Sequence, residues 1–286
     1  MSLTTSGYTT MGHWTPVPPG ATHKLNAREA LLREYRYSFG GADFVAEVPE
    51  AHVEYDGSPH GGRLIHAELL RQATTAYAHV AHQVPLGWAF IMRGMSIEQR
   101  DLFRPGLIEV AVTAQDVLAP RGVLRSLRSE VAFRQQGVVV GRGWGELQVV
   151  SPAIYERIRG HVRPRVEAST LGAWPVRIEP TGKRTWTLEF NPQNRFFFDH
   201  EVDHVPGMVM FAGLSYVIDD IAHQPAAISF QGQFSRYVEL DEPMCIELVD
   251  DEVTLSDGRR LLLALSGANR AIVCEAQVLV STRGPE

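Results

Sequence analysis

Residues 196–223 read FFFDHEVDHVPGMVMFAGLSYVIDDIAH, a polar loop with two histidines that runs directly into an apolar stretch. In that stretch apolar residues recur at helical spacing, at Met210, Leu214, Val217, Ile218 and Ile221. Pro206 suits the start of a helix, because the N–H that proline lacks would have no partner in the first turn. We therefore predict a long helix that opens at Pro206-Gly207, directly after a loop of reactive side chains.

The same arrangement occurs earlier in the chain. A second helical pattern is formed by Leu69, Leu70, Ala73, Ala76, Tyr77 and Val80. When Glu68 is aligned with Ala212, flanking segments also match in the same order, ending with residues 147–151 against 277–281. An ordered set of matches at long period predicts a tandem repeat.

Each copy is predicted to combine its helix with several strands. Alternating patterns indicate strands over residues 107–116, 124–135 and 138–151 in the first copy, and over 227–234, 244–255, 260–266 and 271–281 in the second. One helix against an antiparallel meander is an α+β architecture. The predicted organisation is a flexible arm (residues 1–20), a first copy (21–151), a linker (152–171) and a second copy (172–286).

Composition narrows the function classes. The chain has 286 residues, 44% of them hydrophobic and 21% charged, which is enough for a folded core. A net charge of −6 argues against nucleic acid as a partner. Neither an apolar run of about 18 residues nor a signal-peptide pattern is present, so we expect a cytoplasmic protein without a membrane partner.

The segment from His200 to His204 also satisfies the H-E-x-x-H pattern of zinc peptidases. That chemistry needs both histidines one turn apart on a helix, and Pro206 disfavours a helix through His204. A third ligand is not evident downstream. We therefore expect no metal and no other cofactor at this segment.

Two strings carry a resemblance to a known family. FFFDHEVDHVPGM before the second helix, and the E-x-x-R-Q pattern of Glu68, Arg71 and Gln72 in the first, resemble the A-factor biosynthesis (AfsA-type) hotdog family. The likeness runs along nearly the whole chain after the arm. It implies a tandem hotdog, in which each antiparallel sheet wraps a long central helix. It also implies an acyltransferase of γ-butyrolactone or butenolide signalling-molecule biosynthesis. Such an enzyme moves a β-ketoacyl group from an acyl carrier thioester to the hydroxyl of dihydroxyacetone phosphate.

The resemblance further implies a composite active site. The histidine before the second helix is similar to that of hotdog acyl-carrier-protein dehydratases, which pair it with a Glu on the partner's central helix. Docking the two copies as a pseudo-dimer would place His200 or His204 near Glu68. The second composite site would combine His52 or His60 with Ala212, where the family usually has Glu, so we expect one working site and one degenerate site.

Roles for the site residues follow from their chemistry. Burial at the edge of an apolar stripe raises a carboxylate pKa, which would suit Glu68 to proton transfer. His200 or His204 would act as base toward the acceptor hydroxyl, with Asp203 orienting it or capping the loop. Amides near Gly207 could polarise the thioester carbonyl. The candidates for substrate binding, including bidentate contacts to phosphate, are Arg63, Arg71, Gln72, Arg93 and Arg195.

Other interpretations stay open at this point. The same His and Glu would serve a hotdog dehydratase or thioesterase acting on acyl-carrier substrates. A non-catalytic acyl-binding or lactone-binding module is the third possibility, in which Glu68 would be a satisfied polar residue of the core. The expected partners are an acyl carrier protein or acyl-CoA thioester and a phosphorylated small-molecule acceptor. A monomer and a homo-oligomer of tandem hotdogs both remain compatible with the sequence.

Overall fold

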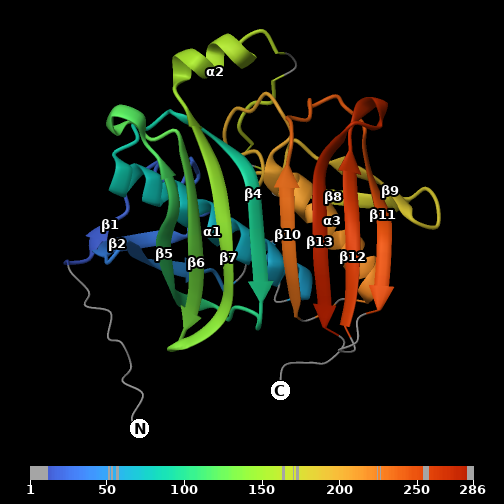
Figure 1. Cartoon of the computed structure of the whole chain (residues 1–286), viewed down its shortest axis with the longest axis horizontal. Helices are drawn as coiled ribbons and strands as arrows, with labels where there is room; N and C mark the ends of the chain where they lie inside the picture. Colours follow the sequence, from blue (N-terminus) through green and yellow to red (C-terminus); the bar gives the residue numbers. More distant parts are fainter. Residues whose placement is uncertain are drawn as a thin grey trace.

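The computed structural model describes residues 12–50, 52, 54–55, 58–162, 165–169, 171, 174–223, 225, 227–253 and 258–281. Within these ranges, thirteen strands form one antiparallel sheet, and two long helices pack on one of its faces (Figure 1). The predicted α+β class is therefore confirmed. In the same ranges, no helix is both long and apolar enough to cross a membrane.

The elements follow the predicted repeat. The arm contributes β1 (Thr15–Pro16), and the first copy contains β2 (Leu32–Ser38), β3 (Gly41–Val48), α1 (Pro59–His82), β4 (Ala89–Gln99), β5 (Gly106–Leu118), β6 (Ser126–Gln135) and β7 (Val138–Val150). A short helix, α2 (Pro152–Arg159), follows it. The second copy contains β8 (Val176–Pro180), β9 (Thr185–Phe190), α3 (Gly207–Ala222), β10 (Ile228–Phe234), β11 (Met244–Val253), β12 (Gly258–Ser266) and β13 (Ile272–Ser281).

The order of the strands shows how the copies join. It runs β1-β2-β3-β5-β6-β7-β4-β10-β13-β12-β11-β9-β8, so β2–β7 on one side mirror β8–β13 on the other. The seam is the antiparallel pair β4–β10, with Gln99 opposite Ile228 and Gly94 opposite Gln233. Each half wraps its strands around one long helix, which confirms the tandem hotdog.

The two helices begin as their sequences predict. Ser58 caps α1, accepting a hydrogen bond from the Gly61 amide at 3.1 Å, and Pro59 occupies the first turn. Helix α3 begins at Gly207 directly after Pro206. Almost all of α1 is buried, including charged and polar side chains in its middle, so this helix places ionisable groups inside the core.

Several strands were not predicted from the sequence. The sequence patterns did not predict β2, β3, β4, β8 or β9. The strand β4 matters most among these, because it forms the seam between the two copies. Its apolar alternation is broken by a bulge between Met92 and Gly94. Gly94 is needed there, because a Cβ would lie 3.0 Å from the Trp144 ring and closer still to Gln233.

The predicted arm and linker are partly structured. Residues 1–11 of the arm lie outside the described residues, but Thr15 and Pro16 pair with Tyr35 and Glu34 of β2. This part of the arm therefore joins the sheet edge instead of moving freely. The linker region contains α2, which stands above the sheet in Figure 1.

Candidate active site

Glu68 lies in the middle of α1 and is fully buried. Arg71 donates two hydrogen bonds to its carboxylate, at 2.7 and 2.9 Å, and Gln72 donates a third at 2.7 Å. The Lys24 ammonium lies 3.6 Å from the same carboxylate. Burial alone would raise the Glu68 pKa, but the charges of Arg71 and Lys24 and these hydrogen bonds hold it below its ordinary value. The expectation of a raised pKa is wrong, and Glu68 is a carboxylate anion.

A loop of the second copy reaches this carboxylate through Lys24 and its neighbour. Lys24 donates to the carbonyl oxygen of Phe196 at 2.5 Å, and the Leu25 amide donates to Asp199 at 2.9 Å. Asp199 in turn lies 2.7 Å from His200 Nδ1. Lys24 and Leu25 thus link Glu68 of the first copy to the loop of the second copy that carries Asp199 and His200.

The Asp199–His200 pair has the form of an oriented base. Asp199 is buried, whereas 44% of the His200 side chain is exposed. Burial raises the Asp199 pKa, but the hydrogen bond from His200 and the charges of Lys24, His200 and Arg71 lower it overall. An ionised Asp199 on Nδ1 fixes the ring and leaves Nε2 directed away from the carboxylate, where it can accept a proton.

His204 belongs to a different cluster. Its Nδ1 lies 2.6 Å from Asp203, which accepts a hydrogen bond from the Tyr155 hydroxyl at 2.8 Å. Arg159 of α2 binds Asp203 at 3.3 Å and Glu239 at 2.8 Å. The two histidines that the sequence groups together are therefore separated, and Asp203 and His204 face the linker helix instead of Glu68.

The zinc-peptidase pattern lacks its helix. Residues 200–204 are not helical, and His200 and His204 each contact the aspartate that precedes them. Among the described residues, no group of three or more His, Cys, Asp or Glu is placed to hold a metal ion.

The candidate arginines occupy four different environments. Arg63 is fully buried between the helices, where it donates to Ser215 at 2.7 Å, to the Pro225 carbonyl and to Asp219. Its donors are taken up by the protein, so the assignment of Arg63 as a phosphate ligand is corrected to a link between the copies. Arg93 is exposed at the β4 bulge, and its charge acts on Tyr237 beside His204.

Two arginines stay near Glu68 and keep some exposure. The side chain of Arg71 is 20% exposed, although it also binds Glu68 and the Thr22 carbonyl. The side chain of Arg195 is 26% exposed, and its Nε donates to buried Glu29 at 3.2 Å. Among the four candidate arginines, these two bind the buried carboxylates Glu68 and Glu29 and still keep part of the guanidinium exposed.

Gln72 and Gly207 have separate roles. Gln72 accepts from the Leu31 amide at 2.8 Å and donates to the Glu29 carbonyl and to Glu68, so it ties α1 to the preceding segment. Its predicted contact with substrate is thereby corrected to a structural one. Gly207 opens α3, and a Cβ placed there would meet nothing within 4 Å. Space therefore remains beside the first turn of α3.

Some residues around Glu68 and Arg195 were not predicted as site residues from the sequence. Lys24 is one of only two lysines in the chain, and this rarity was a usable signal. Buried Glu29 receives His52 at 2.9 Å as well as Arg195, and His52 stacks on Tyr55 with ring centroids 4.2 Å apart. Nothing in the local pattern around Glu29 or Tyr55 distinguishes them from ordinary loop residues.

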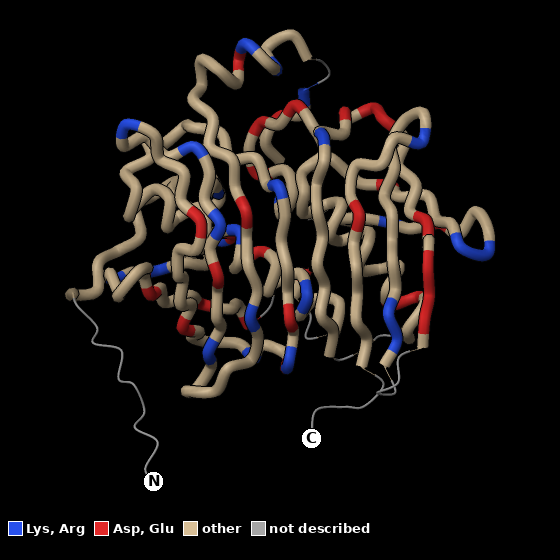
Figure 2. Tube along the Cα trace, in the orientation of Figure 1, with Lys and Arg blue, Asp and Glu red and all other residues tan. Residues whose placement is uncertain are grey.

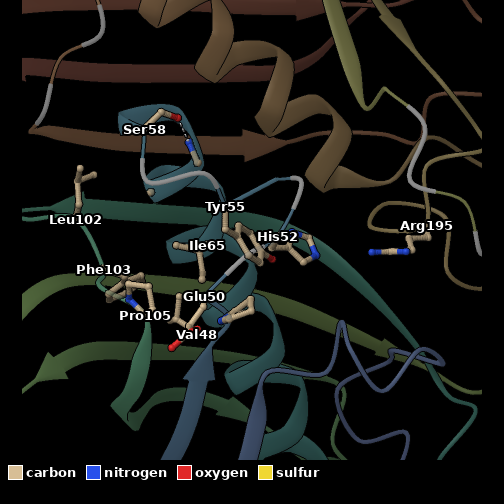
Figure 3. A pocket seen from close by; sticks show the side chains of 13 residues that line it. Val48, Glu50, His52, Tyr55, Ser58, Ile65, Leu102, Phe103, Pro105 and Arg195 are labelled. Atoms are coloured by element: carbon tan, nitrogen blue, oxygen red, sulfur yellow. Dashed lines mark hydrogen bonds between the residues drawn. The ribbon is translucent and has the colours of Figure 1, made fainter.

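A pocket of about 570 Å³ opens beside this group, at the start of α1 (Figure 3). In Figure 3, Leu102 and Phe103 lie on one side of the view and Arg195 on the other, with His52 and Tyr55 between them. Farther away, acidic and basic residues are interspersed along the strands of the sheet (Figure 2).

Known proteins resemble the chain over most of its length. The A-factor biosynthesis hotdog domain matches residues 9–151 and 172–272. The chain is 28% identical over 258 residues (81% of this chain, 86% of the relative) to a 2-oxo-3-(phosphooxy)propyl 3-oxoalkanoate synthase of Streptomyces virginiae. It is 27% identical over 264 residues (81% of each chain) to the synthase of the same name from Streptomyces coelicolor. A 12:0-ACP thioesterase from Umbellularia californica shares the fold, with a TM-score of 0.52, 12% identity and coverage of 83% of this chain and 93% of that one.

Proposed function

The chain belongs to the A-factor biosynthesis hotdog family, and on this premise we propose that it is an acyltransferase that esterifies dihydroxyacetone phosphate with a 3-oxoacyl group. The product in its relatives' name, a 2-oxo-3-(phosphooxy)propyl 3-oxoalkanoate, is the ester of these two components. The acyl donor is a thioester of an acyl carrier protein or of coenzyme A. The observation that supports the proposal is the oriented Asp199–His200 pair, whose loop is bound by Lys24 and Leu25, while Lys24 also contacts Glu68 of the other copy.

In the proposed reaction, His200 Nε2 accepts the proton of the acceptor hydroxyl. The hydroxyl oxygen attacks the thioester carbonyl, a C–O bond forms, the C–S bond breaks, and the proton passes from His200 to the departing thiolate. Asp199 stays ionised and stabilises the imidazolium while it exists. The reaction thus consumes an alcohol and a thioester and yields an ester and a thiol.

Glu68 acts in this scheme as a charge anchor. Its carboxylate fixes Arg71 by two hydrogen bonds and leaves part of the guanidinium exposed toward the acceptor phosphate. Arg195 is the second candidate for that phosphate. The open space at Gly207 would let a carbonyl oxygen approach the first-turn amides of α3, which favour developing negative charge.

The test is a mass-spectrometric transfer assay with a 3-oxoacyl carrier protein, with and without dihydroxyacetone phosphate. We expect a phosphorylated ester only when the acceptor is present, and a loss of about 100-fold or more in His200→Ala. The matched control is His13→Ala, which removes an exposed histidine. Free acid formed without acceptor would make the protein a thioesterase, and enoyl product would make it a dehydratase. Either result would overturn the proposal.

A further inference from the structure

The pocket at the start of α1 has mainly apolar walls. Val48 at the end of β3, Ile65 on α1, and Leu102, Phe103 and Pro105 of the β4–β5 loop line it. Its volume of about 570 Å³ lies within the range of about 300–1,000 Å³ that small-molecule sites occupy. A lining of this kind favours an aliphatic chain, since each buried methylene raises affinity about fourfold.

The loop that forms one wall packs closely on the helix. A Cβ at Gly62 would lie 2.5 Å from Leu102 Cδ2, so the glycine lets the loop approach the first turn of α1. Leu102 itself is only partly buried. Leu102 therefore forms this wall from a loop, and its size can be changed without disturbing the core.

The inner end of the pocket holds a buried donor without a partner. Tyr55 is 7% exposed, and within the described part of the chain its hydroxyl has no hydrogen-bond partner. The His52 ring, which stacks on Tyr55, is engaged elsewhere: its Nε2 binds Glu29, and its Nδ1 accepts from the Glu54 amide. A buried hydroxyl left unpaired is unfavourable, which points to a ligand acceptor atom at this position.

The surrounding charges select the kind of acceptor. Burial raises the pKa of Tyr55, the carboxylates of Glu68, Glu29 and Glu54 raise it further, and the charge of Arg71 opposes them, so the phenol stays protonated. Tyr55 is therefore a neutral donor in an electronegative environment. Such a donor suits the oxygen of an uncharged carbonyl, because the three carboxylates disfavour a further anion beside the phenol, and Arg195, on the other side of the view in Figure 3, already binds Glu29.

We propose that this pocket binds the acyl group of the donor, with its chain between Ile65 and Leu102 and one of its carbonyl oxygens accepting a hydrogen bond from Tyr55. The inference rests on the proposed function for the identity of the ligand, a 3-oxoacyl thioester. It assigns to Tyr55 the recognition of the acyl carbonyl, and to Leu102 and Ile65 the choice of chain length.

The experiment measures binding without turnover. A series of 3-oxoacyl pantetheine amides, in which a stable amide replaces the thioester, is titrated calorimetrically from 6 to 14 carbons with no acceptor present. We expect Leu102→Trp to weaken the longest ligand about tenfold or more and the shortest by less than twofold. Leu118→Trp, at the far exposed end of β5, is the control for a surface leucine.

The hydroxyl is tested separately. We expect Tyr55→Phe to weaken the 3-oxoacyl amides about three- to tenfold and to leave an alkyl thioether of equal length, which has no carbonyl, unchanged. Tyr37→Phe removes a hydroxyl at the other end of α1, bonded to the Val80 carbonyl, and serves as the control. An equal loss for both ligand types would overturn the assignment of Tyr55.

The outcomes separate this inference from the proposed function. Binding with the expected dependence on Tyr55 and Leu102, but no ester in the transfer assay, would support the pocket and reject the transferase. Ester formation with a chain-length profile unaltered by Leu102→Trp would support the transferase and overturn the pocket. Tighter binding of the free 3-oxo acids than of the amides would also overturn it.

Discussion

Glu68 has three hydrogen-bonded or ionic partners, and the sequence around it contains only two of them. Arg71 and Gln72 are one turn away, but Lys24 approaches from a segment far back in the chain. The sequence pattern placed Glu68 on a long helix, as the structure has it, but its protonation state depends on a tertiary contact that the pattern does not reveal. The same holds for Arg63, whose partners Ser215 and Asp219 belong to the other copy.

Substitution of Glu68 by Gln keeps the shape of the side chain and removes its charge. We expect Glu68→Gln to lower acyl transfer at least tenfold, because Arg71 and Lys24 lose the anion that positions them. We also expect a loss of about 3–5 kcal/mol in the free energy of unfolding, typical of removing one partner of a buried ion pair. Urea unfolding and the transfer assay measure both effects, with Glu109→Gln on the exposed face of β5 as control. Unchanged transfer would show that Glu68 is a structural residue of the core and not part of the transfer site.

His23 makes the stability of the fold depend on pH. Its pKa is lowered to about 3 by burial, with further contributions from the charges of Arg71, His79 and His200. In the unfolded chain a histidine titrates near pH 6.5, so the unfolded state takes up a proton first. The stabilisation is complete above about pH 6.5 and is lost as pH falls from there toward 3.

We expect the free energy of unfolding to fall by about 1 kcal/mol per pH unit between pH 6 and pH 4 from this residue. His23→Asn should flatten that slope, and Asn tolerates the positive φ of 52° found at position 23. Denaturant unfolding at several pH values provides the measurement. His13→Asn, in which an exposed histidine is lost, should keep the wild-type slope.

At the scale of elements, the segment of Lys24 and Leu25 works as a strap between copies. It holds the loop of residues 196–199 at two points, the Phe196 carbonyl and the Asp199 carboxylate. The Lys24 ammonium also lies 4.8 Å from the centre of the Phe196 ring. The position of His200 relative to α1 therefore depends on a segment that precedes both central helices.

Replacement of Lys24 by Met tests the strap. We expect Lys24→Met to reduce kcat at least tenfold with a smaller change in KM, because the substrate pocket remains while the base is misplaced. Lys24→Arg should recover part of the rate. Lys183→Met, which removes the other lysine from the exposed β8–β9 turn, is the matched control. An equal loss in both variants would exclude a positioning role.

The predictability of each element followed the strength of its periodicity. Both long helices and the seven strands over residues 107–151 and 227–281 were predicted from pattern alone. The seam strand β4 was not, because the bulge at Arg93 shifts its side chains from one face to the other and erases the alternation. Strand β8 is short, mostly exposed and ends at Pro180, and it lies at the sheet edge, where apolar alternation is not needed.

For the molecule as a whole, the two copies share one sheet and a buried ionic link between their long helices. Arg63 of α1 and Asp219 of α3 pair across the helix interface, with side chains 0% and 11% exposed. We expect Arg63→Met to lower the free energy of unfolding by about 3–5 kcal/mol, because Asp219 loses its guanidinium partner and keeps, among the described residues, only His60, at 3.4 Å. We also expect both copies to unfold in one transition.

Urea unfolding followed by fluorescence and by far-ultraviolet circular dichroism would measure both the free energy of unfolding and the number of transitions. Arg260→Met is the control, since Arg260 pairs with Glu252 at the surface, where both side chains are about half exposed. A small loss for Arg63→Met, or two separate transitions, would show that the helix interface does not couple the copies.

Covalent fusion has a genetic consequence. In a homodimer, any substitution in the gene would appear in both subunits and alter both sites at once. Here the position that aligns with Glu68 is Ala212, a buried residue among the apolar side chains of α3. One half of the duplication could lose its acid while the other kept it. Each copy can thus accumulate substitutions under its own selection. One chain can keep the residues around Glu68 unchanged while the residues around Ala212 acquire a new specificity.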